Sequence, residues 1–386
     1  MLEHLVHPEV RDIAISGIRQ MANRVAAYKD VLSLSIGQPD FPTPDHIVEA
    51  ACRAAKSGKT IYTPNAGLPE LREAAASFMR TKYGLSYDPL HETIVTAGAS
   101  EAIDISLRTI LEPGCEVVLP GPIYPGYEPI IRLCGAKPVY VDVSASGFKL
   151  TADLLAPALT ERTRCVIIAS PSNPTGAALS PEELTDVAAL LVSRDIFVIS
   201  DEIYSELVYD RPHISIAAFP GMRERTIVVN GLSKSHAMTG WRIGFAFSPA
   251  YLSQHLLKVH QYNVTCASSV SQYAAVEALT AGIDDAQPMR EQYAARRDYA
   301  YRRLIAAGFD TEKPEGAFYI FPSIRKYGLD STTFAYRLLD EQRVAVVPGS
   351  AFTSCGEGFI RLSYACSMKT LEEALGRLET FVRSLQ

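Results

Sequence analysis

The residue with the clearest chemical potential is Lys234, which follows an apolar, β-branched run over Thr226–Val229. Hydroxyl side chains flank it at Ser233 and Ser235, and Arg242 stands eight residues further on. A primary amine just past a strand, with hydroxyls and an arginine nearby, suits a carbonyl cofactor that carries a phosphate tail. We therefore interpret Lys234 as a loop lysine that holds pyridoxal phosphate as a Schiff base.

Three other apolar runs are each followed by polar residues that suit the same cofactor. These pairs are 93–96 with Gly98-Ala99-Ser100, 165–169 with Ser170–Gly176, and 196–200 with Asp201 and Tyr204. In an open α/β sheet, ligands bind beyond the carboxyl ends of the strands. We therefore expect donors for a phosphate, the amide of Asn173, a carboxylate, a phenol and the amine of Lys234 to meet at one edge.

A further candidate is Arg361, which interrupts the apolar run Phe359-Ile360-Arg361-Leu362-Ser363. Arginines are common on the surface of strands, but an arginine in so apolar a run more often needs a buried anion. Its planar guanidinium matches a carboxylate through two parallel hydrogen bonds. Arg361 is therefore a candidate for binding a carboxylate.

Each candidate also has a purely structural alternative. Lys234 could be a solvated surface charge, and Asp201 could cap the next helix. Asn173 lies between two prolines and could be only a turn former. Gly98-Ala99-Ser100 could be a plain helix N-cap, although free N–H groups there would equally hold a phosphate. The sequence alone leaves these alternatives open.

Competing motifs are missing from the sequence. No G-x-G-x-x-G occurs, so the sequence lacks the motif that binds nicotinamide dinucleotides. Ser57-Gly58-Lys59-Thr60 resembles the end of a phosphate loop, but Arg53 stands where the first glycine is required. The eight histidines show no H-E-x-x-H or comparable spacing, so we expect no metal site.

The composition describes an ordinary soluble globular protein of 386 residues, 47% hydrophobic and 21% charged. A net charge of −6 argues against a surface that binds nucleic acid. No apolar run reaches about 18 residues, so we expect no membrane span. The N-terminal residues lack the basic and apolar regions of a secretory signal. The seven cysteines form no C-x-x-C pair, which favours free thiols in a reducing cytoplasm.

Strand-like and helix-like segments alternate between residues 60 and 250, which predicts an α/β layer with a largely parallel sheet. The predicted strands are Thr93–Thr96, Glu116–Leu119, Pro138–Val143, Cys165–Ala169, Ile196–Ser200 and Thr226–Val229, with a further apolar run at Ile243–Phe247. Helices are predicted over Asp45–Ser57 and Ser100–Leu111. Another begins at the capping box Ser180-Pro181-Glu182-Glu183 and runs to about Arg194.

The pattern changes beyond about residue 285. Helices are predicted over Met289–Ala307 and Met368–Ser384, and strands over Val31–Ile36, Gly316–Pro322, Val344–Val347 and Phe359–Ser363. We expect an N-terminal arm over 1–40, a large cofactor-binding domain over 41–285, and a small α+β domain over 286–386 that the arm joins in space.

Taken in order, these segments resemble the class I and II aminotransferases of the aspartate aminotransferase fold. The most specific matches are Ser172–Gly176, Asp201–Tyr204, and the stretch from Ser233-Lys234 to Gly240-x-Arg242-x-Gly244. The likeness covers nearly the whole chain, from Ile36–Phe41 to Phe359–Ala365. It implies the pyridoxal-phosphate-dependent transferase fold type I, with a mostly parallel seven-stranded sheet in the large domain and a smaller α+β domain.

The resemblance implies a role for each candidate residue. The implied catalytic residues are Lys234, which carries the cofactor and shuttles a proton, Asp201, which pairs with the ring nitrogen, and Tyr204. The implied cofactor contacts are Gly98, Ala99, Ser100, Ser233 and Arg242 around the phosphate, Asn173 and Tyr204 at the ring oxygen, Tyr124 stacked on the ring, and Tyr62 reaching the phosphate of a neighbouring subunit. The implied substrate contacts are Gly37, Asn173 and Arg361 at the α-carboxylate.

The implied reaction moves an amino group from an L-amino acid to 2-oxoglutarate. The sequences of Tyr62–Gly67 and Gly121–Tyr127 resemble those of the family members that act on N-acetyl-L,L-diaminopimelate in lysine biosynthesis. A broad-range, aromatic or methionine aminotransferase, or a β-lyase on sulfur amino acids, stays open because fold does not fix the reaction. The resemblance also implies a cytoplasmic homodimer with shared active sites, whose other partners are small molecules rather than nucleic acid or membrane.

Overall fold

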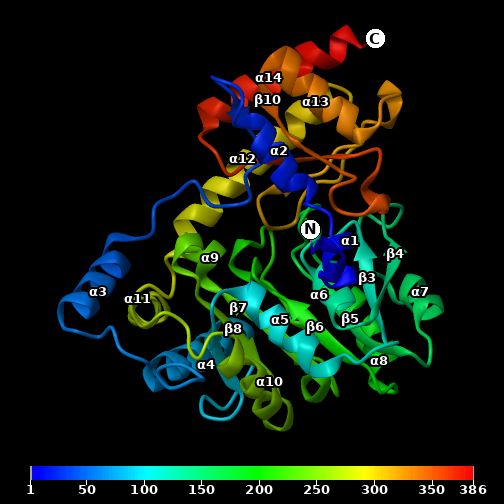
Figure 1. Cartoon of the computed structure of the whole chain (residues 1–386). Helices are drawn as coiled ribbons and strands as arrows, with labels where there is room; N and C mark the ends of the chain where they lie inside the picture. Colours follow the sequence, from blue (N-terminus) through cyan, green and yellow to red (C-terminus); the bar gives the residue numbers. More distant parts are fainter. Residues whose placement is uncertain (1, 386) are drawn as a thin grey trace.

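The computed structural model describes residues 2–385. Its largest element is a seven-stranded sheet with the strand order β2-β8-β7-β6-β5-β3-β4 (Figure 1). The strands are β2 (Thr93–Thr96), β3 (Glu116–Gly121), β4 (Lys137–Asp142), β5 (Thr163–Ala169), β6 (Phe197–Asp201), β7 (Thr226–Gly231) and β8 (Gly244–Phe247). Within this sheet β8 runs in the direction opposite to the other six strands, which are parallel to one another. The predicted mostly parallel, seven-stranded sheet is confirmed.

Helices cover both faces of the sheet (Figure 1). They are α3 (Asp45–Lys56), α4 (Pro69–Tyr83), α5 (Ala99–Ile110), α6 (Tyr127–Leu133), α7 (Ala152–Leu155), α8 (Pro181–Val192), α9 (Leu232–Ser235), α10 (Ala250–Asn263) and α11 (Ser269–Leu279). Val117 and Leu119 of β3 pack with α5, α6 and α10, whereas the intervening Val118 packs with α8. Because both faces are buried, these strands read as continuous apolar runs.

The C-terminal residues form a second packed region beyond one end of the large sheet (Figure 1). Its elements are α12 (Ala286–Ala306), α13 (Ser331–Gln342), α14 (Met368–Ser384), β9 (Tyr319–Ile320), β10 (Val344–Ala345), β11 (Val347–Pro348) and β12 (Ile360–Ser363). The order β11-β12-β9 makes an antiparallel sheet, and β10 pairs in parallel with β1 (Leu32–Ser33) of the N-terminal arm. The domain boundaries near residues 40 and 285 stay a prediction.

Local details agree with the sequence at some points and differ at others. The capping box at Ser180 forms with Glu183 and starts α8 at Pro181. The single strand predicted over 344–347 is wrong, because β10 and β11 belong to two different sheets. Lys234 was expected on a loop, but it lies in the one-turn helix α9, directly after β7.

Several helices go beyond the sequence predictions, namely α2 (Gly17–Val25), α4, α10, α11 and α13. The signals for α4 were present in the sequence. Pro69 occupies the start of α4, where a missing N–H costs nothing, and Gly84 ends it with a φ of 68°. Such start and stop residues mark this helix more clearly than its apolar periodicity does.

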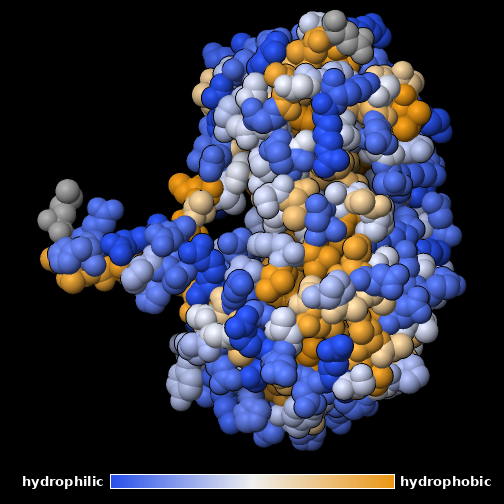
Figure 2. All heavy atoms as spheres, turned by 90° about the vertical axis from the view of Figure 1, so that its right-hand side faces the viewer, coloured by the Kyte–Doolittle hydropathy of each residue, from blue (hydrophilic) through white to orange (hydrophobic). Residues whose placement is uncertain are grey.

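The first residues of the chain stand clear of the body. Figure 2 shows this segment projecting to one side, with apolar atoms along part of it. It contains α1 (Pro8–Asp12), and Leu2, Leu5 and Ile15 expose 72%, 69% and 62% of their surface. An ion pair of 2.9 Å between Glu9 and Arg132 ties it to α6. Apolar surface on a projecting segment favours its burial in an assembly.

Two negative findings concern residues 2–385. None of the helices in this range is both long and apolar enough to cross a lipid bilayer. The same residues contain no group of three or more histidine, cysteine, aspartate or glutamate side chains that could hold a metal ion.

Candidate active site

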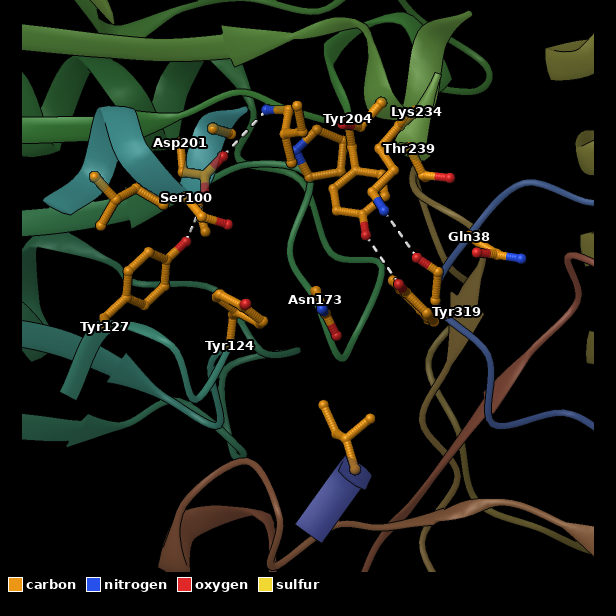
Figure 3. Close-up of a pocket in the computed structure, with 18 of the residues that line it drawn as sticks. Gln38, Ser100, Tyr124, Tyr127, Asn173, Asp201, Tyr204, Lys234, Thr239 and Tyr319 are labelled. Atoms are coloured by element: carbon orange, nitrogen blue, oxygen red, sulfur yellow. Dashed lines mark hydrogen bonds between the residues drawn. The ribbon is translucent and has the colours of Figure 1, made fainter. Parts of the chain in front are cut away.

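A cavity of about 380 Å³ lies where the carboxyl ends of β5, β6 and β7 meet the start of α5 (Figure 3). Most of the predicted site residues line it, namely Gly37, Ala99, Ser100, Tyr124, Asn173, Asp201, Tyr204, Ser233, Lys234, Arg242 and Arg361. They come from seven segments that are far apart in the sequence. The expected convergence at one edge of the sheet is therefore present.

Lys234 points into this cavity (Figure 3). Its ammonium donates a hydrogen bond of 2.8 Å to the backbone carbonyl of Gly37. Burial, followed by repulsion from Arg361 and Arg242, lowers the pKa of Lys234 to about 8. The surface-charge alternative is therefore wrong, and the amine is poised to lose its proton near neutral pH.

Asp201 ends β6 and is 6% exposed. Its Oδ2 accepts a hydrogen bond of 2.6 Å from the phenol of Tyr127, and its Oδ1 accepts one of 3.2 Å from the N–H of Ile203 (Figure 3). Burial raises the pKa of Asp201 although both hydrogen bonds oppose this shift. The short 3-10 helix that follows has Tyr204 at its N-cap, so Asp201 caps no helix. A buried carboxylate beside a cavity suits a cationic group such as a protonated ring nitrogen.

Arg361 lies in β12 and is 1% exposed. It donates hydrogen bonds of 2.8 Å to Oδ1 of Asn173 and to the carbonyl of Ser35, while its Nε has no partner. Tyr319 and Phe352 stack on it at 4.3 and 4.9 Å. A buried guanidinium with a free N–H and neutral partners has unused capacity for an anion. Asn173 is therefore more than a turn former, because it orients this arginine.

The predicted phosphate end is built from backbone and small side chains. Gly98 is the N-cap of α5 with a φ of 86°, and a side chain there would collide with the guanidinium of Arg242. The first N–H groups of α5, at Ala99 and Ser100, have no partner within the helix. Together with Ser233 and Arg242 they form a cradle of donors at a helix N-terminus, which fits a phosphate.

The remaining aromatic candidates lie in different places. Tyr124 borders the cavity and meets Tyr127 edge to face, with ring centroids 5.5 Å apart. The hydroxyl of Tyr204 lies 2.9 Å from that of Tyr319, and burial raises the pKa of Tyr204 well above its ordinary value. Tyr62 does not line the cavity and is 84% exposed. Within one chain, Tyr62 therefore points to solvent and takes no part in the cavity.

The structure adds site residues that the sequence predictions missed. Tyr127 and Tyr319 hold Asp201 and Tyr204, and Ile18, Gln38 and Thr239 also line the cavity. Tyr127 had a signal, since it ends the Gly121–Tyr127 segment three residues after Tyr124. Gln38 and Thr239 lie in or beside segments that carry the family resemblance, whereas Ile18 and Tyr319 have no local pattern that marks them as functional.

Comparisons with known proteins show the family of this chain. The family model for "Aminotransferase class I and II" matches residues 29–378. A "Probable N-acetyl-LL-diaminopimelate aminotransferase" of Bacillus subtilis (strain 168) is 60% identical over 381 residues, which cover 99% of this chain and 96% of that protein.

Two solved structures extend the likeness to the fold. An aspartate aminotransferase from Rhizobium meliloti matches with a TM-score of 0.93 and 38% identity, covering 97% of this chain and 98% of the other. An N-succinyldiaminopimelate aminotransferase from Mycobacterium tuberculosis matches with a TM-score of 0.92 and 35% identity, covering 97% and 99%. The aspartate aminotransferase fold is therefore confirmed, and the chain belongs to the class I and II aminotransferases, a pyridoxal-phosphate-dependent family.

Proposed function

We propose that this aminotransferase moves the amino group of N-acetyl-L,L-diaminopimelate to 2-oxoglutarate, as a step of lysine biosynthesis. The observation that carries the chemistry is the convergence of three groups in one cavity, namely the amine of Lys234, the carboxylate of Asp201 and the unsatisfied guanidinium of Arg361. The choice of donor rests on the likeness to the Bacillus subtilis protein.

The charged groups of the cavity fit pyridoxal phosphate, and each has a different role in the reaction. When bound, this cofactor supplies an electron-poor ring that delocalises the charge left when the substrate Cα loses a proton. Asp201 keeps a proton on the ring nitrogen, because a buried carboxylate stabilises a cation beside it. The amine of Lys234 takes the proton from Cα, and a base of this kind contributes roughly 10²–10⁴ in rate. Its lowered pKa leaves part of it neutral at pH 7.

Arg361 and Asn173 bind the α-carboxylate of the donor. The planar guanidinium of Arg361 lines the cavity and can contact a carboxylate through two parallel hydrogen bonds. Gly37 belongs to the same wall, and a side chain there would lie 2.7 Å from the hydroxyl of Tyr319. Gly37 therefore keeps this side open for the carboxylate to approach.

The rest of the cavity suits the neutral acetamido group of the donor, whose far end also carries a second carboxylate. Among its described lining residues the cations are Lys234, Arg242 and Arg361, all of which have roles above. Gln38, Thr239 and Ile18 add neutral hydrogen-bonding and apolar groups. Such groups favour an acylated amine over a free, charged one.

We further propose a cytoplasmic homodimer with shared active sites. Tyr62 is 84% exposed and is free to contact the phosphate in a partner's cavity. The exposed apolar residues of the N-terminal segment offer a second surface for the same partner. Apart from a second copy of the chain, the binding partners are amino acids and 2-oxo acids. We place the boundaries of the large domain near residues 40 and 285.

A panel of donors tests the assignment. The purified, cofactor-loaded protein is given 2-oxoglutarate with N-acetyl-L,L-diaminopimelate, aspartate, an aromatic amino acid or methionine, and the glutamate formed is measured. The proposal expects the highest kcat/KM with N-acetyl-L,L-diaminopimelate. A higher value for another donor would replace the substrate assignment. Release of pyruvate and thiol from sulfur amino acids without an acceptor would instead support a β-lyase.

A further inference from the structure

The loop of residues 37–43, here termed the Gly37 loop, connects the arm to the large sheet region and carries two residues of the cavity wall, Gly37 and Gln38. It has no helix or strand of its own, so no backbone ladder holds it in place. Its carbonyl at Gly37 nevertheless accepts a 2.8 Å hydrogen bond from Lys234. On its N-terminal side the chain is held by backbone bonds of Leu34 and by the carbonyl of Ser35. On its C-terminal side the position of this carbonyl depends on side-chain contacts of the loop.

The strongest of these contacts is the ion pair between Asp40 and Arg296 of α12. The Nη1 of Arg296 lies 2.8 and 2.9 Å from the two carboxylate oxygens of Asp40. The phenol of Tyr293, one turn earlier, donates to Oδ1 of Asp40 at 3.1 Å and accepts from its N–H at 3.3 Å. The Arg296 guanidinium also lies over the ring of Phe41, 5.2 Å from its centroid. Since the Arg296 side chain is 9% exposed, water screens this pair only weakly.

The far end of the loop is fixed to another part of the site. Thr43 donates a hydrogen bond of 2.8 Å to the carbonyl of Ala237 and accepts one of 3.0 Å from the indole of Trp241. Both partners follow Lys234 closely in the chain. The loop is therefore attached to α12 at Asp40 and to the residues that follow Lys234 at Thr43. Gly37 and Gln38 lie on the N-terminal side of Asp40.

We propose that Asp40 and Arg296 are positioning residues that hold the Gly37 carbonyl against the Lys234 amine and Gln38 in the cavity wall. The catalytic importance of the Lys234 amine rests on the proposed aminotransferase function, whereas the contacts that position it do not. Neither residue lines the cavity. Their effect on the reaction therefore passes through the loop, and it concerns donor binding and the protonation of Lys234 rather than the proton transfer itself.

Helix α12 offers a matched control next to this pair. Arg297 is also buried and forms an ion pair of 2.7 Å with Asp210, which lies outside the Gly37 loop, and a second of 2.9 Å with the neighbouring Asp298. Asp40→Asn therefore removes the charge of the partner of Arg296, and Asp210→Asn removes the charge of a partner of Arg297, the next residue of the same helix. Arg296→Lys keeps the positive charge but loses the planar fork, so it should give an intermediate effect.

Two measurements test the proposal. The first is KM and kcat with glutamate, the amino acid formed from 2-oxoglutarate, so that the outcome does not depend on N-acetyl-L,L-diaminopimelate. We expect Asp40→Asn to raise KM about 10-fold, with a smaller change in kcat, because a charge-assisted contact is lost. Asp210→Asn should leave both near wild type.

The second measurement uses the protein without cofactor. The rate at which an amine-specific reagent modifies Lys234 is followed against pH, with a Lys234→Ala background to subtract other lysines. Loss of the Gly37 acceptor removes a partner of the ammonium, so the midpoint for Asp40→Asn should fall below the wild-type value while Asp210→Asn keeps it. An unchanged midpoint and KM in Asp40→Asn, or equal changes in both variants, would overturn the proposal.

Discussion

The phenol of Tyr127 donates a hydrogen bond of 2.6 Å to Oδ2 of Asp201 in the wall of the cavity (Figure 3). This bond opposes the burial that raises the pKa of Asp201. It therefore helps to keep the carboxylate ionised and aimed at the cavity, where the proposed ring nitrogen needs an anion.

Tyr127→Phe should lower kcat about 10-fold, because a hydrogen bond to a charged group contributes about 1.5–3 kcal/mol. Tyr140→Phe is the matched control. Tyr140 donates to Glu128 over the same 2.6 Å but does not line the cavity. Steady-state kinetics of both variants check this, and similar losses in the two would mean that Tyr127 acts only through stability.

Capture of pyridoxal phosphate by the cofactor-free protein should speed up as the pH rises through about 8 and then level off. The reason is that only neutral Lys234 attacks an aldehyde, and the neutral form predominates above its pKa of about 8. Below that value the rate should fall roughly tenfold per pH unit. Absorbance after rapid mixing measures the rate. A midpoint near 10.4, the value of a solvated lysine, would contradict the buried environment.

Arg361→Lys should raise the KM for amino donors by roughly 10–100-fold, with a smaller effect on kcat. Lysine keeps the charge but lacks the fork that contacts Asn173, Ser35 and a carboxylate together. Arg325→Lys is the control, since Arg325 stacks 4.7 Å from the Phe359 ring and does not line the cavity. An unchanged KM in Arg361→Lys would show that another group binds the α-carboxylate.

Mixing two inactive variants should restore activity if the sites are shared. Lys234→Ala removes the amine from its own cavity, and Tyr62→Ala removes the contact proposed for the partner's cavity. A mixed dimer then contains one cavity with both groups intact. Random mixing predicts about a quarter of wild-type activity after the subunits exchange. Activity that stays at the level of the separate variants would argue that Tyr62 serves no partner site.

The amino-acid sequence was enough to predict the strand-and-helix alternation of the large sheet and to single out Lys234, Asp201, Asn173 and Arg361 as candidate site residues. This was possible because each of them interrupts an apolar strand or follows one within a few residues. Local start and stop signals also placed helices such as α8, which begins at its capping box.

Which of these groups meet depends on the three-dimensional packing of the chain. The bond from Tyr127 to Asp201, the contact of Lys234 with Gly37, and the pair of Asp40 with Arg296 join residues separated by 74, 197 and 256 positions. No local pattern encodes such pairs, because they depend on how separate elements pack. The burial that lowers the pKa of Lys234 is likewise a property of the whole cavity, which no stretch of sequence contains.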